Sequence, residues 1–259
     1  MDTLVYPVLF GLGFVGGFFS GLLGIGGGII MVPLLLYLPP FFGMAPIPMK
    51  VVAGITAVQS FVGAASGAAS HNRYGRIHLG LAVSVGVPMA MASLAASLAS
   101  GFVSNEIMLI VFALMALAAA LLMVLPLSEP ESDQFLQHVQ FNRATAIVIG
   151  LVVGTFAGVI GQGGAFLYIP ALLYVLRVPT RITIGSSLAI GIASSAAVLL
   201  GRIGTDQVPW VWATVLVIGV VIGAQLGGVL SQYTPKLVLR KILAVVIIGS
   251  ALRIWWDLL

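Results

Sequence analysis

The chain has 259 residues, of which 60% are hydrophobic and 7% are charged, and its formal net charge at pH 7 is +4. A soluble domain carries about a quarter charged residues, so this composition excludes an ordinary soluble protein. The basic balance does not indicate a nucleic-acid partner, because the Lys and Arg residues lie between apolar runs of about 20 residues, the length that crosses a bilayer. The absence of cysteine excludes disulfides, thiolate metal sites and cysteine nucleophiles.

Ten hydrophobic segments follow one another along the chain, five in each half. They are at 5–23, 27–38, 50–70, 79–100 and 106–126, and then at 144–160, 164–176, 182–200, 208–230 and 237–256. Asp2 precedes the first segment and no basic region does, so this segment is predicted to be a retained span rather than a cleaved signal peptide. The predicted fold is an all-α integral membrane protein with five helical segments in each half.

The polar stretch 127–143 divides one membrane domain into a first transmembrane repeat, 1–126, and a second, 144–259. The two repeats are similar in sequence, because 17–38 aligns with 154–175 without a gap. The identical pairs in this alignment are Gly17/Gly154, Phe19/Phe156, Gly21/Gly158, Gly24/Gly161, Gly26/Gly163, Gly27/Gly164, Pro33/Pro170, Leu35/Leu172, Leu36/Leu173 and Tyr37/Tyr174. Self-similarity at a fixed spacing indicates a duplicated unit.

The distribution of basic residues predicts the orientation of the two halves. If all ten segments cross the membrane, one side receives only Lys50, Arg202 and Arg253. The other side then receives Arg73, Arg76, Arg143, Arg177, Arg181, Lys236, Arg240 and Lys241. If the short second segment of each half returned to its own side instead, the two sides would be nearly equal. Because cytoplasmic loops carry an excess of Lys and Arg, the uneven division favours ten crossings, inverted halves, a cytoplasmic linker and both termini outside the cytoplasm.

Each half has a glycine loop between its first two segments. The first glycine loop (24–28) reads Gly-Ile-Gly-Gly-Gly, and the second glycine loop (161–164) reads Gly-Gln-Gly-Gly and is followed by Ala165. The apolar helix predicted after each loop is too short for the roughly 30 Å hydrocarbon core. Short, glycine-broken helices at corresponding places in two halves indicate the binding site of a carrier near the midplane of the membrane. The free N–H groups and positive dipole ends of the two helix starts would hold an anion.

Hydroxyl and amide groups of the third segments complete the predicted site, with Thr56 of one half aligned with Ser187 of the other. The predicted substrate-binding residues are Gly24, Gly26, Gly27, Gly28, Thr56, Gln59, Gly161, Gln162, Gly163, Gly164, Ser186 and Ser187. The alternative role of the hydroxyls is to bond a carbonyl of their own or a neighbouring helix. The alternative role of the glycines is close helix packing, which is the role predicted for Gly13, Gly17 and Gly21.

Charged residues are absent from the middle of every predicted span, as an insertion cost of roughly 2.5 to 3.5 kcal/mol per central charge leads us to expect. An internal carboxylate relay therefore has no candidate, and proton coupling would need a substrate that itself carries the proton. Lys50 and Arg181 begin the two third segments and are expected to be topology anchors, with an anion funnel as the alternative. Three histidines, His71, His78 and His138, show no ligand spacing, so neither a metal nor a cofactor is predicted.

At the two glycine loops and the segments after them the chain resembles the sulfite exporter TauE/SafE family, also called the TSUP transporters. The resemblance rests on the first glycine loop with Val32-Pro33-Leu34-Leu35, on the second with Ile169-Pro170, and on the helix starts Ala53-Gly54-Ile55-Thr56 and Ile184-Gly185-Ser186-Ser187-Leu188. It implies a bacterial inner-membrane carrier that exports sulfite, sulfoacetate, thiosulfate or a similar anion. Two departures are Ala165 in place of a third glycine, and Ile55-Thr56-Ala57 in place of a Thr-Ser-Leu type of sequence.

The predicted function is transport of a small sulfur-containing or organic anion by alternating access. An anion channel and a carrier for an unrelated small carboxylate are the alternatives. A membrane-embedded enzyme would need clustered histidines or carboxylates, and no catalytic residue is predicted. A purely structural protein would not need irregular backbone repeated at equivalent positions. The expected partners are the anion and the lipid bilayer, with no nucleic acid, and the sequence does not define an oligomeric state.

Overall fold

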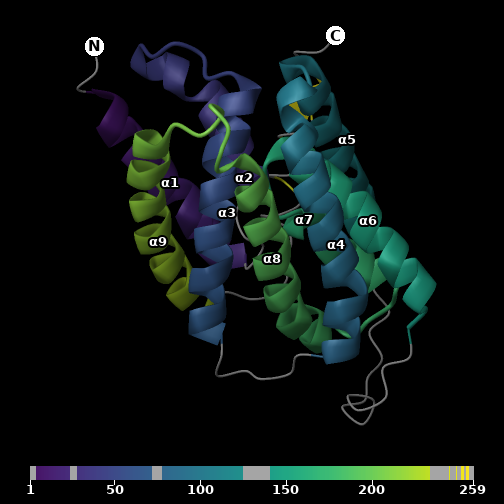
Figure 1. Ribbon diagram of the computed structural model, residues 1–259. Helices are drawn as coiled ribbons and strands as arrows, with labels where there is room; N and C mark the ends of the chain where they lie inside the picture. The colour runs from purple at the N-terminus through teal and green to yellow at the C-terminus, as the bar shows by residue number, and fades with distance from the viewer. Residues whose placement is uncertain are drawn as a thin grey trace.

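A computed structural model of the chain describes residues 4–23, 28–71, 78–124 and 141–233, and six single positions between 245 and 256. Regular structure in these residues is entirely helical (Figure 1), which confirms the predicted all-α fold. The elements are α1 (Val5–Leu23), α2 (Gly28–Tyr37), η2 (Pro39–Phe42), α3 (Met49–His71), α4 (Leu79–Ala99), η4 (Ser100–Phe102), α5 (Asn105–Val124), α6 (Arg143–Ile160), α7 (Ala165–Pro170), η6 (Ala171–Val175), α8 (Thr180–Arg202) and α9 (Trp210–Tyr233).

Seven helices of the described part are long and apolar enough to cross a membrane, namely α1, α3, α4, α5, α6, α8 and α9. They coincide with seven of the predicted segments. The two short segments predicted after the glycine loops are also present, as α2 and as α7 continued by η6. The predicted segment 237–256, apart from single positions, and most of the linker 127–143 lie outside the described residues.

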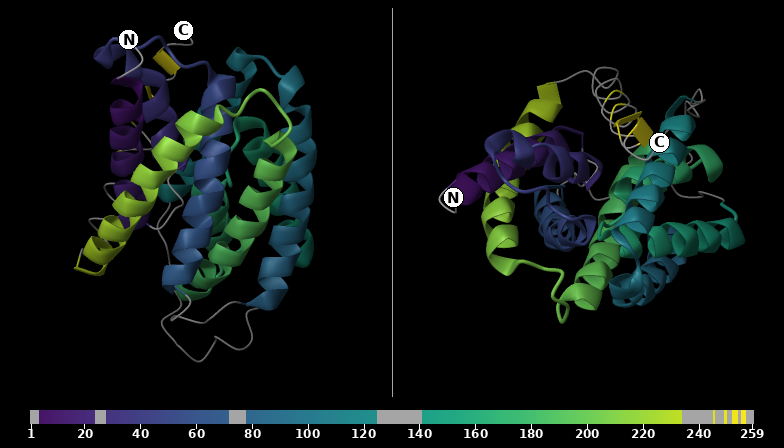
Figure 2. Two further views of the ribbon diagram at one scale, coloured as in Figure 1. Left: turned by 60° about the vertical axis from the view of Figure 1, so that its left-hand side comes forward. Right: turned by 90° about the horizontal axis from the view of Figure 1, so that it is seen from above.

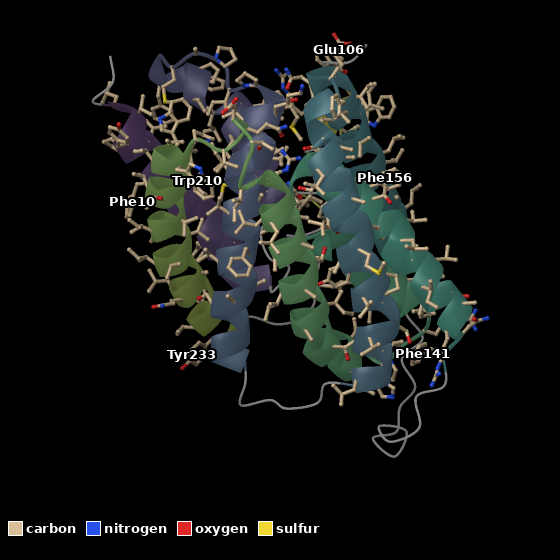
Figure 3. The ribbon with its side chains drawn as sticks, in the orientation of Figure 1. Phe10, Glu106, Phe141, Phe156, Trp210 and Tyr233 are labelled. Carbon is tan, nitrogen blue, oxygen red and sulfur yellow. The ribbon has the colours of Figure 1, made fainter. Side chains whose placement is uncertain are left out.

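Large apolar side chains lie on the outside of the helix bundle. Phe10 of α1 and Phe156 of α6 lie on opposite outer edges in Figure 3, and each is 38% exposed. Phe102, at the end of η4, is 95% exposed. Large apolar side chains exposed on so many helices are unfavourable in water, whereas lipid chains match them. The bundle is therefore a multi-pass membrane domain.

Contacts between helix starts define two ends of the bundle, which we call the upper and lower ends after Figure 1. At the upper end, the N–H of Lys50 at the start of α3 donates to Oδ1 of Asn105 at the start of α5, at 2.9 Å. At the lower end, the rings of His78 and Phe141, which directly precede α4 and α6, lie 5.8 Å apart. Thus α3 and α5 run downward while α4 and α6 run upward (Figures 1 and 3).

Two helix pairs pack through glycines at equivalent positions of the two halves. The pairs are α1 with α9, on one side of the bundle, and α4 with α6, on the other (Figure 2). A Cβ atom added to any of these glycines would collide with a backbone carbonyl of the facing helix. The packing role predicted for the glycines of α1 is thereby confirmed, and α6 repeats it. The glycines are Gly13, Gly17 and Gly21 of α1, and Gly150, Gly154 and Gly158 of α6.

The short helices carry the two aligned prolines. Pro33 lies inside α2, and Pro170 ends α7. After Pro170 the chain widens into the π-helix η6, in which the N–H of Leu176 donates to the carbonyl oxygen of Ala171 at 3.1 Å. Proline lacks an N–H donor and crowds the preceding turn, so a change of helix type after it is expected, and such π segments are frequent near functional sites.

Candidate functional site

The second glycine loop reverses the chain between α6 and α7. Gly161 follows α6 with a φ of 74°, and its N–H donates to the carbonyl oxygen of Ala157. The N–H of Gln162 donates to the same oxygen at 2.9 Å. Gly164 has a φ of 69° and directly precedes α7. A positive φ is strained for residues with a side chain, so the backbone itself requires glycine at 161 and 164.

Thr56 of α3 contacts this loop. Its Oγ1 lies 2.9 Å from the carbonyl oxygen of Val52, 3.2 Å from that of Ala53 and 3.2 Å from that of Gly161. The single hydroxyl proton can serve only one of these acceptors at a time. A Cβ at Gly161 would collide with the carbonyl of Ala53, so α3 and the loop are in direct backbone contact. Thr56 therefore bonds carbonyls of its own helix, which is the alternative role considered for it, and also contacts the loop.

The two glycine loops meet through Gln162. Its side chain is 1% exposed, and its Nε2 donates to the carbonyl oxygen of Gly28 at 2.8 Å. A Cβ at Gly28 would lie 2.5 Å from Oε1 of Gln162, an oxygen that has no hydrogen-bond partner in the described part of the chain. The predicted proximity of the loops is thus present at Gly28 and Gln162. The other predicted residues of the first loop, Gly24, Gly26 and Gly27, lie outside the described residues.

Gly163 differs from its neighbours because a Cβ atom there would meet only ordinary van der Waals contacts. The nearest heavy atom to a Cβ at this position would be Cβ of Ser195 at 3.4 Å, followed by the carbonyl oxygen of Gly191 at 3.8 Å. Both residues belong to α8, where Oγ of Ser195 donates to that same carbonyl at 2.6 Å. Packing alone therefore does not require glycine at 163.

The predicted serines of α8 contact other helices. Oγ of Ser186 accepts a hydrogen bond from the N–H of His78 at 3.1 Å, beside the start of α4. The carbonyl oxygen of Ser187 accepts one from the hydroxyl of Tyr168 at 2.8 Å. Gln59 of α3 is fully buried, like Ser186. The structure thus brings Ser187 next to α7, directly after the second glycine loop, and engages Ser186 at the lower end of the bundle.

Arg202 does not lie where the sequence predicted it. We expected it in a loop beyond the segment 182–200, but it is the last residue of α8 and 0% exposed. Its Nη2 donates to the carbonyl oxygens of Gly158 and Val159 at 3.1 and 2.7 Å, and its Nη1 donates to Oε1 of Gln207. The assignment of every basic side chain to a loop is therefore wrong for Arg202. The carbonyls at the C-terminal end of α6, the negative end of its dipole, offset part of the cost of burying this charge.

Three polar residues of this region had no distinctive signal in the sequence: Tyr168, Arg202 and Gln207. Each is defined by a contact with another helix: Tyr168 with α8, Arg202 with α6, and Gln207 with Ser100 at the start of η4. An arginine just after an apolar run looks the same whether it faces water or caps another helix. Only the packing of α6 against α8 distinguishes the two.

These observations define the class of protein. An apolar outer surface, seven candidate spans and two short helices whose glycine loops meet inside the bundle are features of a secondary transporter. The chain belongs to the sulfite exporter TauE/SafE family, whose sequence profile matches residues 9–254. The resemblance stated on the glycine loops is therefore confirmed over nearly the whole chain.

Similar proteins carry transporter names. A probable membrane transporter protein of Xylella fastidiosa (strain 9a5c) is 28% identical, over 96% of this chain and 94% of the relative. The probable membrane transporter protein YdhB of Bacillus subtilis is 26% identical, over 92% and 94%. A probable membrane transporter protein of Methanocaldococcus jannaschii is 21% identical, over 90% and 89%. No solved structure matches the chain. The protein is a multi-pass membrane transporter of this family.

Proposed function

We propose that the protein carries a small sulfur-containing or organic anion, such as sulfite, sulfoacetate or thiosulfate, out of the cell across the bacterial inner membrane by alternating access. The family description supports a sulfur oxyanion and export. The observation that carries the proposal is the hydrogen bond between Gln162 and Gly28. It brings the N-terminal ends of α2 and α7 together inside the bundle, and free N–H groups at helix starts favour an anion.

The anion is held mainly by backbone N–H groups near Gly28 and Gly164, with help from the side chains of Thr56, Ser187 and Gln162. A hydrogen bond to a charged group contributes about 1.5 to 3 kcal/mol, so several together offset much of the dehydration of an oxyanion. Gly163 supports this assignment, because neither packing nor a positive φ requires glycine there, and close approach of a ligand to the backbone is a further reason for glycine.

Proton coupling through the substrate has a matching acceptor. Oε1 of Gln162 is buried and has no donor in the described part of the chain. A fully deprotonated oxyanion has no proton to offer this oxygen, whereas a singly protonated one does. A protonated substrate would therefore satisfy the amide at the same time as it carries its proton.

We infer that the two halves are inverted repeats, with both termini outside the cytoplasm. The glycine stripes of α1 and α6 make equivalent contacts, yet α1 begins at the upper end of Figure 1 and α6 at the lower end. The guanidinium of Arg253 lies 5.1 Å from the ring centroid of Tyr37, at the end of α2. Arg253, near the C-terminus, therefore lies at the same upper end as the start of α1.

Cysteine labelling tests this orientation, and the chain has no native cysteine to remove. Single Asp2→Cys, Ser132→Cys and Asp257→Cys variants are treated in intact cells with a thiol reagent that cannot cross the membrane. Labelling at positions 2 and 257 but not at 132 is expected. Labelling at 132 in intact cells would contradict the proposed orientation.

Counterflow in proteoliposomes tests the substrate and separates a carrier from a channel. Vesicles loaded with unlabelled sulfite should transiently accumulate external radiolabelled sulfite, which a channel cannot do. Empty vesicles and vesicles with Gly163→Leu are the controls. Counterflow with a sulfur-free carboxylate, and none with sulfite, thiosulfate or sulfoacetate, would replace the proposal by the carboxylate alternative.

A further inference from the structure

Arg202 is a buried cation whose partners are all neutral. It is 0% exposed, and its three hydrogen bonds go to the carbonyls of Gly158 and Val159 and to the amide of Gln207. It makes no ion pair with any carboxylate of the described residues, and the acidic residue nearest in sequence, Asp206, is exposed. A helix C-terminus supplies roughly half a negative charge. The positive charge of Arg202 is therefore incompletely compensated.

One donor of the guanidinium is also unused. Nε of Arg202 is buried and has no hydrogen-bond partner in the part of the chain that the structure describes. Buried donors are normally paired. Arginine donates charge-assisted hydrogen bonds to the oxygens of anions. An oxyanion beside the guanidinium would thus supply the missing negative charge.

The position of Arg202 links it to the second glycine loop. The carbonyls that it caps, those of Gly158 and Val159, belong to the last turn of α6, directly before Gly161. Its other partner, Gln207, has its backbone carbonyl against Gly54, two residues before Thr56. The guanidinium therefore lies beside the same stretch of α3 and α6 that holds the loop.

We propose that Arg202 binds the transported anion directly, with an oxygen of the substrate taking the place of Gln207 on Nη1. This proposal rests on the proposed transport of an anion. The substrate then replaces an amide oxygen, so an anion with oxygen acceptors, such as sulfite or a sulfonate, binds in preference to a halide. Gln207 is then the competing acceptor that the substrate displaces.

The test measures the thermal midpoint of purified protein as a function of sulfite, thiosulfate and sulfoacetate concentration, with sodium chloride at equal ionic strength as the reference. Ligands that bind the folded state raise the midpoint by mass action. Arg202→Gln should weaken the best anion at least tenfold. Lys50→Gln is the matched control, because Nζ of Lys50 also donates to a carbonyl at a helix end, that of Gly101 at 2.9 Å, but at the surface. It should leave the affinity within twofold of the wild type.

Gln207→Leu separates a binding role from a merely structural one. Without anion this variant should melt earlier, because Nη1 of Arg202 loses its acceptor. Its affinity for the anion should nevertheless rise severalfold, because the competitor is gone, whereas a structural role would lower stability without tightening binding. This variant also decides the question if Arg202→Gln does not fold.

Three outcomes count against the proposal. If Arg202→Gln binds the anion as the wild type does, Arg202 is only a helix cap. If Gln207→Leu binds no more tightly than the wild type, the exchange of acceptors does not occur. If no anion of the panel stabilises the wild type, the proposed anion transport itself fails, and the role of Arg202 fails with it.

Discussion

The glycines of α6 and the glycines of the loop that follows it meet different surroundings. Gly154 and Gly158 face the backbone of α4, and their Cβ positions are occupied by carbonyl groups. Gly161, three residues further on, is required by both its positive φ and the backbone of Ala53. Gly163 meets nothing closer than 3.4 Å. Glycine content alone thus does not mark a site, because most of these glycines serve helix packing or a backbone turn, and among these four only Gly163 serves neither.

The largest effect is expected at the helix stripes. Gly17→Leu and Gly154→Leu each place a side chain into the backbone of the facing helix, so the helices must separate, at a cost of about 3 kcal/mol or more. Thermal melting in detergent should show a strongly lowered midpoint or no folded protein. Gly11→Leu is the control, because a Cβ there has nothing within 4 Å. Equal thermal midpoints for all three variants would contradict the packing role.

Within the second glycine loop, Gly161→Ala and Gly163→Ala form a matched pair. Gly161→Ala forces a side chain into the left-handed region, at roughly 1 to 2 kcal/mol, and adds a collision with Ala53. Its melting midpoint should fall clearly. For Gly163→Ala the free energy of unfolding should stay within about 0.5 kcal/mol of the wild-type value, since its Cβ meets only ordinary contacts.

Transport assays then test why position 163 is glycine. Gly163→Leu should yield a folded protein that no longer moves labelled sulfite in vesicles, because the side chain fills the region where backbone meets ligand. Gly26→Leu is expected to behave likewise in the first loop. Normal transport by both leucine variants would show that the loops serve helix packing and do not bind the substrate.

Much of this arrangement could be predicted from the sequence, for a physical reason. A bilayer requires long apolar runs, and the glycine and proline positions repeat in both halves. The spans, the short helices and the similarity of the two loops can therefore be predicted from short stretches of sequence. The contact of Gln162 with Gly28, the burial of Arg202 and the bond from Tyr168 to Ser187 are not local. They depend on which helices pack against each other, and the hydrophobic pattern of the sequence does not predict that.

A smaller effect is expected from the hydroxyls aligned in the two halves. Thr56→Val removes the donor that lies 3.2 Å from the carbonyl of Gly161, and Ser187→Ala removes its counterpart in α8. Loss of one hydrogen bond costs about 1 kcal/mol, or roughly fivefold in affinity. Calorimetry with sulfite on the purified variants measures it. Unchanged affinity in both would confine these hydroxyls to helix packing.

The smallest equilibrium effect is expected at Lys50 and Arg181, which begin the aligned helices α3 and α8. Nζ of Lys50 already donates to the carbonyl of Gly101, and exposed charges are screened beyond about 10 Å at 0.1 M salt. Lys50→Gln and Arg181→Gln should therefore change the rate of uptake at low salt, by lowering the local concentration of the anion, while affinity stays within twofold. Uptake rates at two ionic strengths, set beside calorimetric affinities, measure both quantities. An affinity loss confined to these two variants would move the binding site from the glycine loops to the membrane surface, because only a residue in contact with the bound anion changes its equilibrium binding at high salt.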